Sequence, residues 1–180
     1  MNRAHDRKTV RPLQHGYRGL RAESSGQAAV EFALVLTVAM IVLFVAIQMA
    51  LIGQAALALG QANYQATRWA AVNNCSTADD VMNYMIAVGS PTITTNCGSH
   101  LTLTLSDVTA GAGAFGVGAG SASCSSPITP ACGANTGRTF GDQIKVSVTF
   151  DAASQLFLKS PFLGITFPTT LSSTESAMSE

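Results

Sequence analysis

The sequence predicts an α+β protein in which a long N-terminal transmembrane helix carries a small extracytoplasmic antiparallel β-sheet domain with a short second helix. Two observations predict this fold class. In residues 32–52 only Thr37 and Gln48 interrupt an otherwise apolar run of 21 residues, the length that a helix needs to cross about 30 Å of hydrocarbon. Residues 101–106 and 144–151 alternate apolar with polar side chains, which is typical of strands with one buried face.

Charge divides the chain at the start of the apolar run. Residues 1–26 carry six basic and two acidic side chains, whereas the rest carries four basic and eight acidic ones. We interpret residues 1–26 as a basic leader peptide without regular structure. Positive charge favours the cytoplasmic side of a membrane helix, so a single-pass protein with an internal N-terminus is expected. A buried core helix is the alternative to a membrane span, but such helices are seldom apolar on every face.

The helix is expected to occupy residues 27–74, with its transmembrane part at about 28–52. Residues 54–74 are rich in Ala, Leu and Gln and contain no proline, a composition that favours helix. Small side chains recur there every three or four residues and predict close contact with other helices, or simply good helix propensity. This small-residue stripe consists of Leu59, Ala62, Ala66, Trp69 and Ala70.

Residues 75–180 are expected to form the extracytoplasmic domain. Thr77 can cap a short helix whose first turn holds Asp79 and Asp80. The two alternating segments are predicted to pair as antiparallel strands. Residues 110–141 form a glycine-rich loop without periodicity, and residues 165–178 could add a strand that Pro168 confines to an edge or breaks.

Four cysteines lie in this domain: Cys75, Cys97, Cys124 and Cys132. An even number in an oxidising compartment favours two disulfides, for which three pairings are possible. We favour Cys75–Cys97 and Cys124–Cys132. Zinc is the rival interpretation, but no CxxC occurs and His100 has no nearby partner histidine. We therefore predict no metal site.

The sequence contains no motif that is typical of an enzyme active site. Neither a Ser/His/Asp elbow, HExxH nor a paired-carboxylate cluster occurs, and the glycines form no phosphate-binding motif. The basic N-terminal arm is short and adjoins the span, which argues against nucleic-acid binding. We predict a protein that is not an enzyme, needs no cofactor and contacts membrane lipid.

The junction between leader and span has a distinctive sequence, Gly26-Gln-Ala-Ala-Val-Glu31-Phe32. It resembles the processing site of type IV pilin-like proteins, and its glutamate–aromatic pair resembles the TadE-like pseudopilins of tight-adherence (Flp, type IVc) pilus systems. Residues 68–73, RWAAVN, are similar to the end of the long helix in that family. The Ser/Thr-rich C-terminal part resembles it too, although the usual basic residue near the final glutamate is missing before Glu180.

The resemblance implies that a prepilin peptidase cuts after Gly26 and makes Gln27 the first mature residue. Glu31 would then pair with the freed amine of a neighbouring subunit and, with Phe32, set the register of assembly. A pseudopilin or minor pilin of the bacterial inner membrane is implied, acting in pilus assembly and hence in adhesion. Its partners would be the peptidase, other pilin or pseudopilin subunits, and the inner-membrane assembly platform.

Two alternatives stay open on the sequence alone. One is an uncleaved single-pass anchor whose outer domain binds a ligand or envelope partner. The other is a secreted domain released by a cut beyond the span, which would begin near residue 56.

Overall fold

The protein is described by a computed structural model covering residues 19–123, 137–153 and 164–180. The α+β fold class is confirmed: a long N-terminal apolar helix is followed by short helices and a four-stranded antiparallel sheet. The chain forms two compact units, divided between Ala46 and Ile47. In order, the elements are α1 (Gly19–Val72), α2 (Ala78–Val88), α3 (Pro91–Gly98), β1 (Leu101–Asp107), the 3-10 helix η1 (Gly111–Gly113), β2 (Gly118–Gly120), β3 (Gln143–Asp151) and β4 (Thr170–Met178).

The sheet has the strand order β2-β1-β3-β4. β1 and β3 pair antiparallel, with Leu103 opposite Val148 and Leu105 opposite Val146, so the predicted pairing of the two alternating segments is confirmed. β4 begins two residues after Pro168 and pairs with β3 at an edge of the sheet. The predicted edge position of this Ser/Thr-rich strand is therefore also confirmed.

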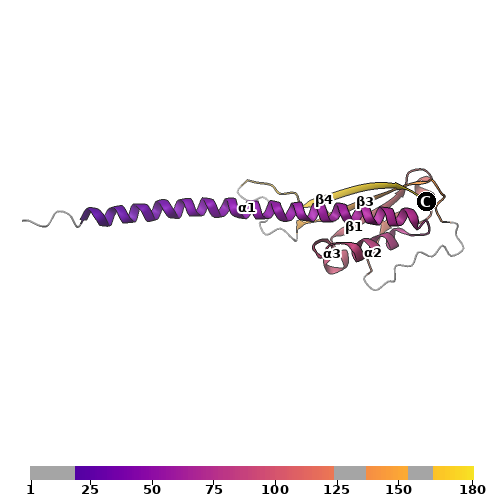
Figure 1. The fold of residues 1–180 in the computed structure, drawn as a ribbon, viewed down its shortest axis with the longest axis horizontal. Helices are drawn as coiled ribbons and strands as arrows, with labels where there is room; N and C mark the ends of the chain where they lie inside the picture. Colours follow the sequence, from indigo (N-terminus) through magenta and orange to yellow (C-terminus); the bar gives the residue numbers. More distant parts are fainter. Residues whose placement is uncertain (1–18, 124–136, 154–163) are drawn as a thin grey trace, which may run out of the picture. The chain divides into compact units, whose positions relative to one another are not determined.

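One face of the sheet holds the core of the second unit, and the C-terminal part of α1 runs along the strands (Figure 1). The apolar side chains of β1 and β3 are buried there against α1 and α2, whereas alternate residues such as Thr102 and Lys145 are exposed on the opposite face. From α2 the core receives Val81, Met82 and Met85. The sheet thus has one helix-covered face and one open polar face.

The small-residue stripe of α1 packs on this sheet. Ala66 and Ala70 are fully buried, and Leu59 and Ala62 nearly so. This corrects the expectation of contact with other helices for the small side chains, which lie in the core shared with the sheet, whereas Trp69 of the stripe does contact a helix, through Tyr84 of α2. Within the stripe, buried Asn63 donates through Nδ2 to the Val146 carbonyl at 3.4 Å and to Ser173 Oγ at 3.1 Å.

The second helix begins with the predicted Thr77 cap. Thr77 and Asp80 form a capping box, in which each side chain bonds to the backbone N–H of the other residue. The sequence did not predict α3, which begins at Pro91, two residues after Gly89. Pro91 at its first position has a φ suited to helix and lacks only an N–H that would be unpaired there.

The glycine-rich segment is more structured than predicted. η1 and the short strand β2 both lie within it, while residues 124–136 fall outside the described part. β2 can lie against α2 because Gly120 lacks a side chain: a Cβ there would come 3.1 Å from that of Met82. Alternation could not predict a strand built from Gly and Ala.

Arg138, from the end of the same segment, caps α1 from a distance. Its guanidinium is buried and donates to the carbonyls of Ala70 (2.8 Å), Asn73 (3.0 Å) and Ser76 (2.7 Å). Burial lowers the pKa of Arg138, and the nearby carboxylates of Asp107 and Asp142 oppose that shift. A cation is favourable at a helix C-terminus, and α1 has no basic residue in its own last turn.

The described cysteines do not support the favoured pairing. Cys75 precedes α2 in the chain, and Cys97 lies in α3, which follows α2. The 11 residues of α2 rise about 16 Å, whereas the Cα atoms of a disulfide are about 4.4–6.8 Å apart. Neither Cys75 nor Cys97 is a free thiol, and the predicted Cys124–Cys132 bridge lies outside the described residues.

The start of α1 also differs from the prediction. The helix begins at Gly19, seven residues before Gly26, so residues 19–25 are helical rather than part of an irregular leader. Leu20, Arg21, Ala22 and Glu23 are good helix formers, which accounts for the extension. The predicted cut after Gly26 therefore falls inside a helix.

Candidate assembly surface

The described residues of the first unit present an apolar surface. Every residue from Gly26 to Met40 is exposed, including Val30, Val35 and Phe32, the last at 68%. We call residues 26–46 the apolar segment. α1 is long and apolar enough to cross a membrane, and none of its most apolar window is buried. Because covering each large apolar side chain is worth about 1.5–3 kcal/mol, this segment suggests a membrane anchor.

The predicted site residues Gln27 and Glu31 lie together at the start of this segment. They are one helical turn apart, and Gln27 Nε2 donates to Glu31 Oε1 at 3.2 Å. Both side chains are exposed, as is the adjacent Phe32. The contact was visible in the sequence as an i,i+4 spacing that lets an amide reach a carboxylate. The carboxylate keeps further acceptor positions for a cation.

The two polar residues inside the apolar run have different surroundings. Thr37 Oγ1 donates to the Ala33 carbonyl at 2.8 Å, which satisfies the hydroxyl within its own helix and suits it to an apolar environment. Gln48 belongs to the second unit and is 1% exposed. Neither residue therefore places an unsatisfied polar group at the helix surface of the apolar segment.

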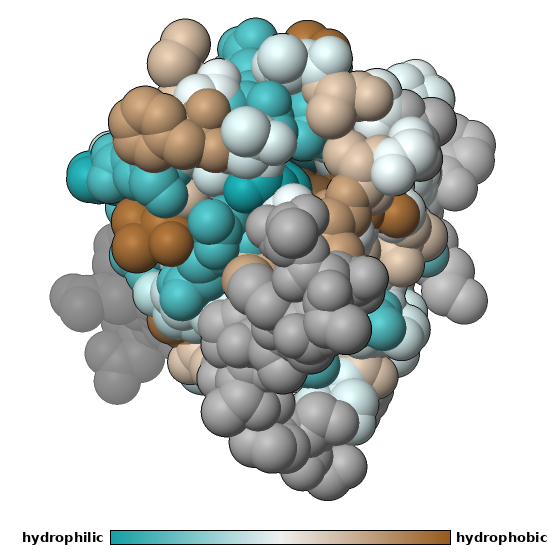
Figure 2. All heavy atoms as spheres, turned by 90° about the vertical axis from the view of Figure 1, so that its right-hand side faces the viewer, coloured by the Kyte–Doolittle hydropathy of each residue, from teal (hydrophilic) through white to brown (hydrophobic). Residues whose placement is uncertain are grey.

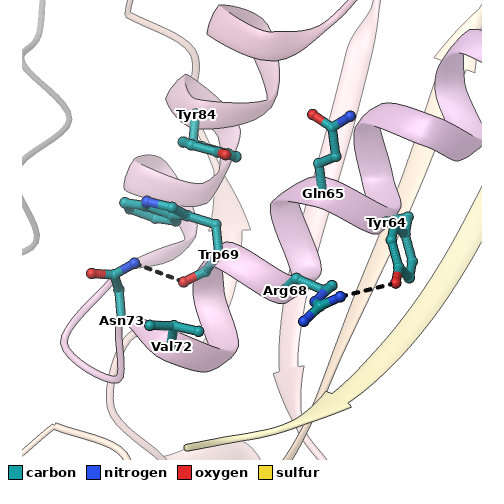
Figure 3. A pocket seen from close by; sticks show the side chains of 7 residues that line it. All are labelled: Tyr64, Gln65, Arg68, Trp69, Val72, Asn73 and Tyr84. Carbon is teal, nitrogen blue, oxygen red and sulfur yellow. Dashed lines mark hydrogen bonds between the residues drawn. The ribbon is translucent and has the colours of Figure 1, made fainter.

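A second surface feature is a groove between α1 and α2, shown in Figure 3. Its volume is about 460 Å³, and Tyr84 reaches it from α2. The rings of Trp69 and Tyr84 stack with centroids 4.8 Å apart and planes 11° from parallel. We call it the Trp69 groove; from α1 it is lined by Tyr64, Gln65, Arg68, Trp69, Val72 and Asn73.

Among the described residues, Arg68 is the one charged side chain that lines the Trp69 groove. Its Nη1 donates to the Tyr64 hydroxyl at 3.3 Å, and its guanidinium lies 6.0 Å from the centre of that ring. Glu180 is close enough to attract the guanidinium electrostatically. The backbone N–H of Glu180 donates to the Ala71 carbonyl at 3.0 Å, which holds the C-terminal residues against the last turns of α1.

The end of the second unit has a different surface. Figure 2 faces this end and shows hydrophobic and hydrophilic residues side by side on the described part of that face. Sequence reasoning singled out Trp69 and the RWAAVN segment but missed Tyr84 as its partner, since a contact between two helices leaves no local pattern. Among described residues, no three His, Cys, Asp or Glu side chains are grouped to hold a metal ion.

These features define an α+β protein with an exposed, anchor-like N-terminal helix that begins with a glutamine–glutamate pair. A family model described as TadE-like protein matches residues 26–68. The chain is TadE-like over this segment, which confirms the resemblance and indicates a protein associated with tight-adherence pili. No curated protein matches the chain, and no solved structure does.

Proposed function

We propose that the chain is a pseudopilin or minor pilin that a prepilin peptidase processes after Gly26 and that acts in assembly of a tight-adherence pilus, and hence in adhesion. The observation that supports this most directly is the exposed apolar segment with Glu31 at its start, inside the TadE-like match. Such a segment is covered by lipid before assembly and by other pilin or pseudopilin helices, joined at the assembly platform, afterwards. The size of the whole chain, 180 residues, favours a minor or assembly-priming role.

Glu31 is the residue on which the proposal depends. A carboxylate entering hydrocarbon is costly unless it is paired, and Gln27 offers it a neutral amide. After a cut behind Gly26, the Gln27 amine of a neighbouring subunit would supply the positive charge. Pairing of this kind sets the axial register between subunits. A subunit displaced along the axis by one helical turn would leave both the Glu31 carboxylate and the neighbouring Gln27 amine unpaired.

Gly26 suits the cut in two ways. A Cβ at this position would meet nothing within 4 Å, so packing does not explain the glycine. Glycine also weakens a helix by about 0.5–1 kcal/mol relative to alanine, which makes local opening of α1 at the cut easier. Opening is needed because residues 19–25 are helical.

The test is pilus assembly by a strain whose single copy carries Glu31→Gln. This variant keeps the shape and loses the charge, so it should reach the membrane and be cut yet leave the cells without pili. An unpaired amine in the helix bundle would cost about 3–5 kcal/mol. Glu23→Gln is the matched control, because it removes a carboxylate from the same helix on the leader side of the cut. Wild-type pilus numbers in the Glu31→Gln strain would refute the pairing role.

The alternative function is an uncleaved single-pass anchor with an outer binding domain. The observation that favours it is the continuity of α1 through Gly26. The N-terminal residue of the mature membrane protein separates the candidates: Gln27 supports the pseudopilin, an intact leader supports the anchor, and a start near residue 56 would indicate a released domain.

Topology and disulfides complete the proposal. The basic leader lies in the cytoplasm, and residues 53–180 lie outside the inner membrane, where disulfides form. There, Cys75 and Cys97 belong to two separate disulfides, since α2 separates them. With four cysteines in the chain, each of the two then bonds either Cys124 or Cys132.

A further inference from the structure

We propose that the Trp69 groove is the contact surface of a two-fold symmetric dimer, in which Arg68 of each copy pairs with Glu180 of a second copy of this chain. The inference depends on membrane anchoring through α1 and not on pilus assembly, so the two proposals can fail independently.

The composition of the groove is that of a protein contact. Trp, Tyr and Arg dominate the residues whose loss weakens protein interfaces most, and all three line this groove. Tyr64 is 51% exposed and Val72 60% exposed, so much of the apolar area of the groove is available to a partner. The stacked Trp69 and Tyr84 rings form one wall of it (Figure 3).

The charges of Arg68 and Glu180 indicate that the partner in the groove is a second copy of this chain. Among the described residues, the guanidinium of Arg68 makes a single hydrogen bond, to Tyr64, although it has five N–H donors. No carboxylate is among the described residues that line the groove. The carboxylate that attracts Arg68 is that of Glu180, which is exposed and whose backbone N–H donates to the Ala71 carbonyl. A cation and an anion therefore stand side by side on one surface.

A surface with both charges is complementary to itself. In a two-fold dimer each residue i that contacts j is matched by j contacting i, so Arg68 meets Glu180 twice, once on each side of the axis. Two copies anchored in one membrane by the same helix hold their second units in the same thin layer beside it. Confinement to the membrane also raises their effective concentration, so a contact that is weak in solution suffices.

The dimer is tested with the full-length protein in the membranes of cells without a pilus system. Two copies with different epitope tags are co-expressed, each with a photo-cross-linking amino acid at Gln65, which lines the groove. Irradiation should give a product that carries both tags. The same cross-linker at Thr149, exposed on the open face of the sheet, is the positional control and should give none.

Charge reversal then tests the pairing. Arg68→Glu expressed alone, or Glu180→Arg expressed alone, should lower the yield of the two-tag product about tenfold, because two attractive pairs become two repulsive ones. Co-expression of an Arg68→Glu copy with a Glu180→Arg copy should restore it, since each charge again faces its opposite. A misfolded variant cannot be rescued in this way.

Three results would overturn the proposal. The first is no two-tag product from Gln65, or products with other proteins alone. The second is an equal yield from Thr149, which would indicate random collision. The third is a mixture of the two single variants that cross-links no better than either variant by itself.

Discussion

Arg138→Met should destabilise the second unit more than any other single loss of charge in the described chain. Arg138 is 3% exposed, and its guanidinium donates to three backbone carbonyls and to Ser76 Oγ. Methionine has similar length but no donor, so the carbonyls of Ala70, Asn73 and Ser76 lose their Arg138 partner in the interior.

The size of the effect follows from two opposing contributions. Each buried acceptor left unsatisfied costs about 1–3 kcal/mol, whereas removing a buried cation recovers part of the cost of taking it out of water. Asp107 would at the same time lose the nearby positive charge. We expect a net loss of about 3–5 kcal/mol in the free energy of unfolding, the range for removing one partner from a buried charged network.

Trp69, the single tryptophan of the chain, lies near the capped end of α1 and reports unfolding by its fluorescence. Denaturant titration of the full-length protein in detergent should show a lower midpoint for Arg138→Met. Lys145→Met is the matched control: it removes an exposed cation from the open face of the sheet and should leave the midpoint near wild type. A change of less than about 1 kcal/mol for Arg138→Met would mean that water or other groups satisfy those carbonyls equally well.

Three further predictions concern processing, packing and disulfides. Gly26→Val should stop the cut without preventing insertion, whereas Gly53→Val, at another open position, should be processed normally; mass spectrometry of the N-terminal peptide decides, and a Gln27 start in Gly26→Val would contradict the cut site. Ala66→Leu should cost about 1–3 kcal/mol because it overpacks a fully buried contact between α1 and the sheet. Ala56→Leu, at an exposed position, should be neutral in the same unfolding assay, and equal stabilities would show that the stripe is loosely packed. Non-reducing peptide mapping should place Cys75 and Cys97 in different disulfides, so a peptide joining the two would refute their separation by α2.

Local patterns accounted for most of the fold. The apolar run predicted the anchor helix, Thr77 with Asp80 predicted the start of α2, and strict alternation predicted β1 and β3, because each of these signals comes from residues close together in the chain. The small-residue stripe was located correctly, but its partner was not. A face of alanines indicates that something approaches closely and does not say whether that is a helix or a sheet.

The remaining features depend on contacts that no local pattern encodes. Arg138 caps a helix more than 60 residues earlier, from a segment that reads as loop because it is rich in glycine. β2 is built from Gly and Ala and shows no alternation. Tyr84 completes the Trp69 groove from another helix. Cysteine spacing likewise does not determine connectivity, so the favoured Cys75–Cys97 bridge stays a prediction of the sequence, and the position of α2 between the two cysteines in the chain argues against it.

Asn63 gives the nearly uniform stripe of α1 a single fixed position. Ala62, Ala66 and Ala70 repeat every four residues. A helix displaced by one turn would therefore place nearly the same small side chains against the sheet as the native helix does. A displaced helix would take the Asn63 amide away from both the Val146 carbonyl and Ser173 Oγ and bury it without a partner, and a single buried polar residue is known to select one register among near-equivalent ones. Asn63 therefore opposes sliding of α1 along the sheet at the middle of the stripe, and the bonds of Arg138 to the Ala70 and Asn73 carbonyls oppose it at the end of the helix.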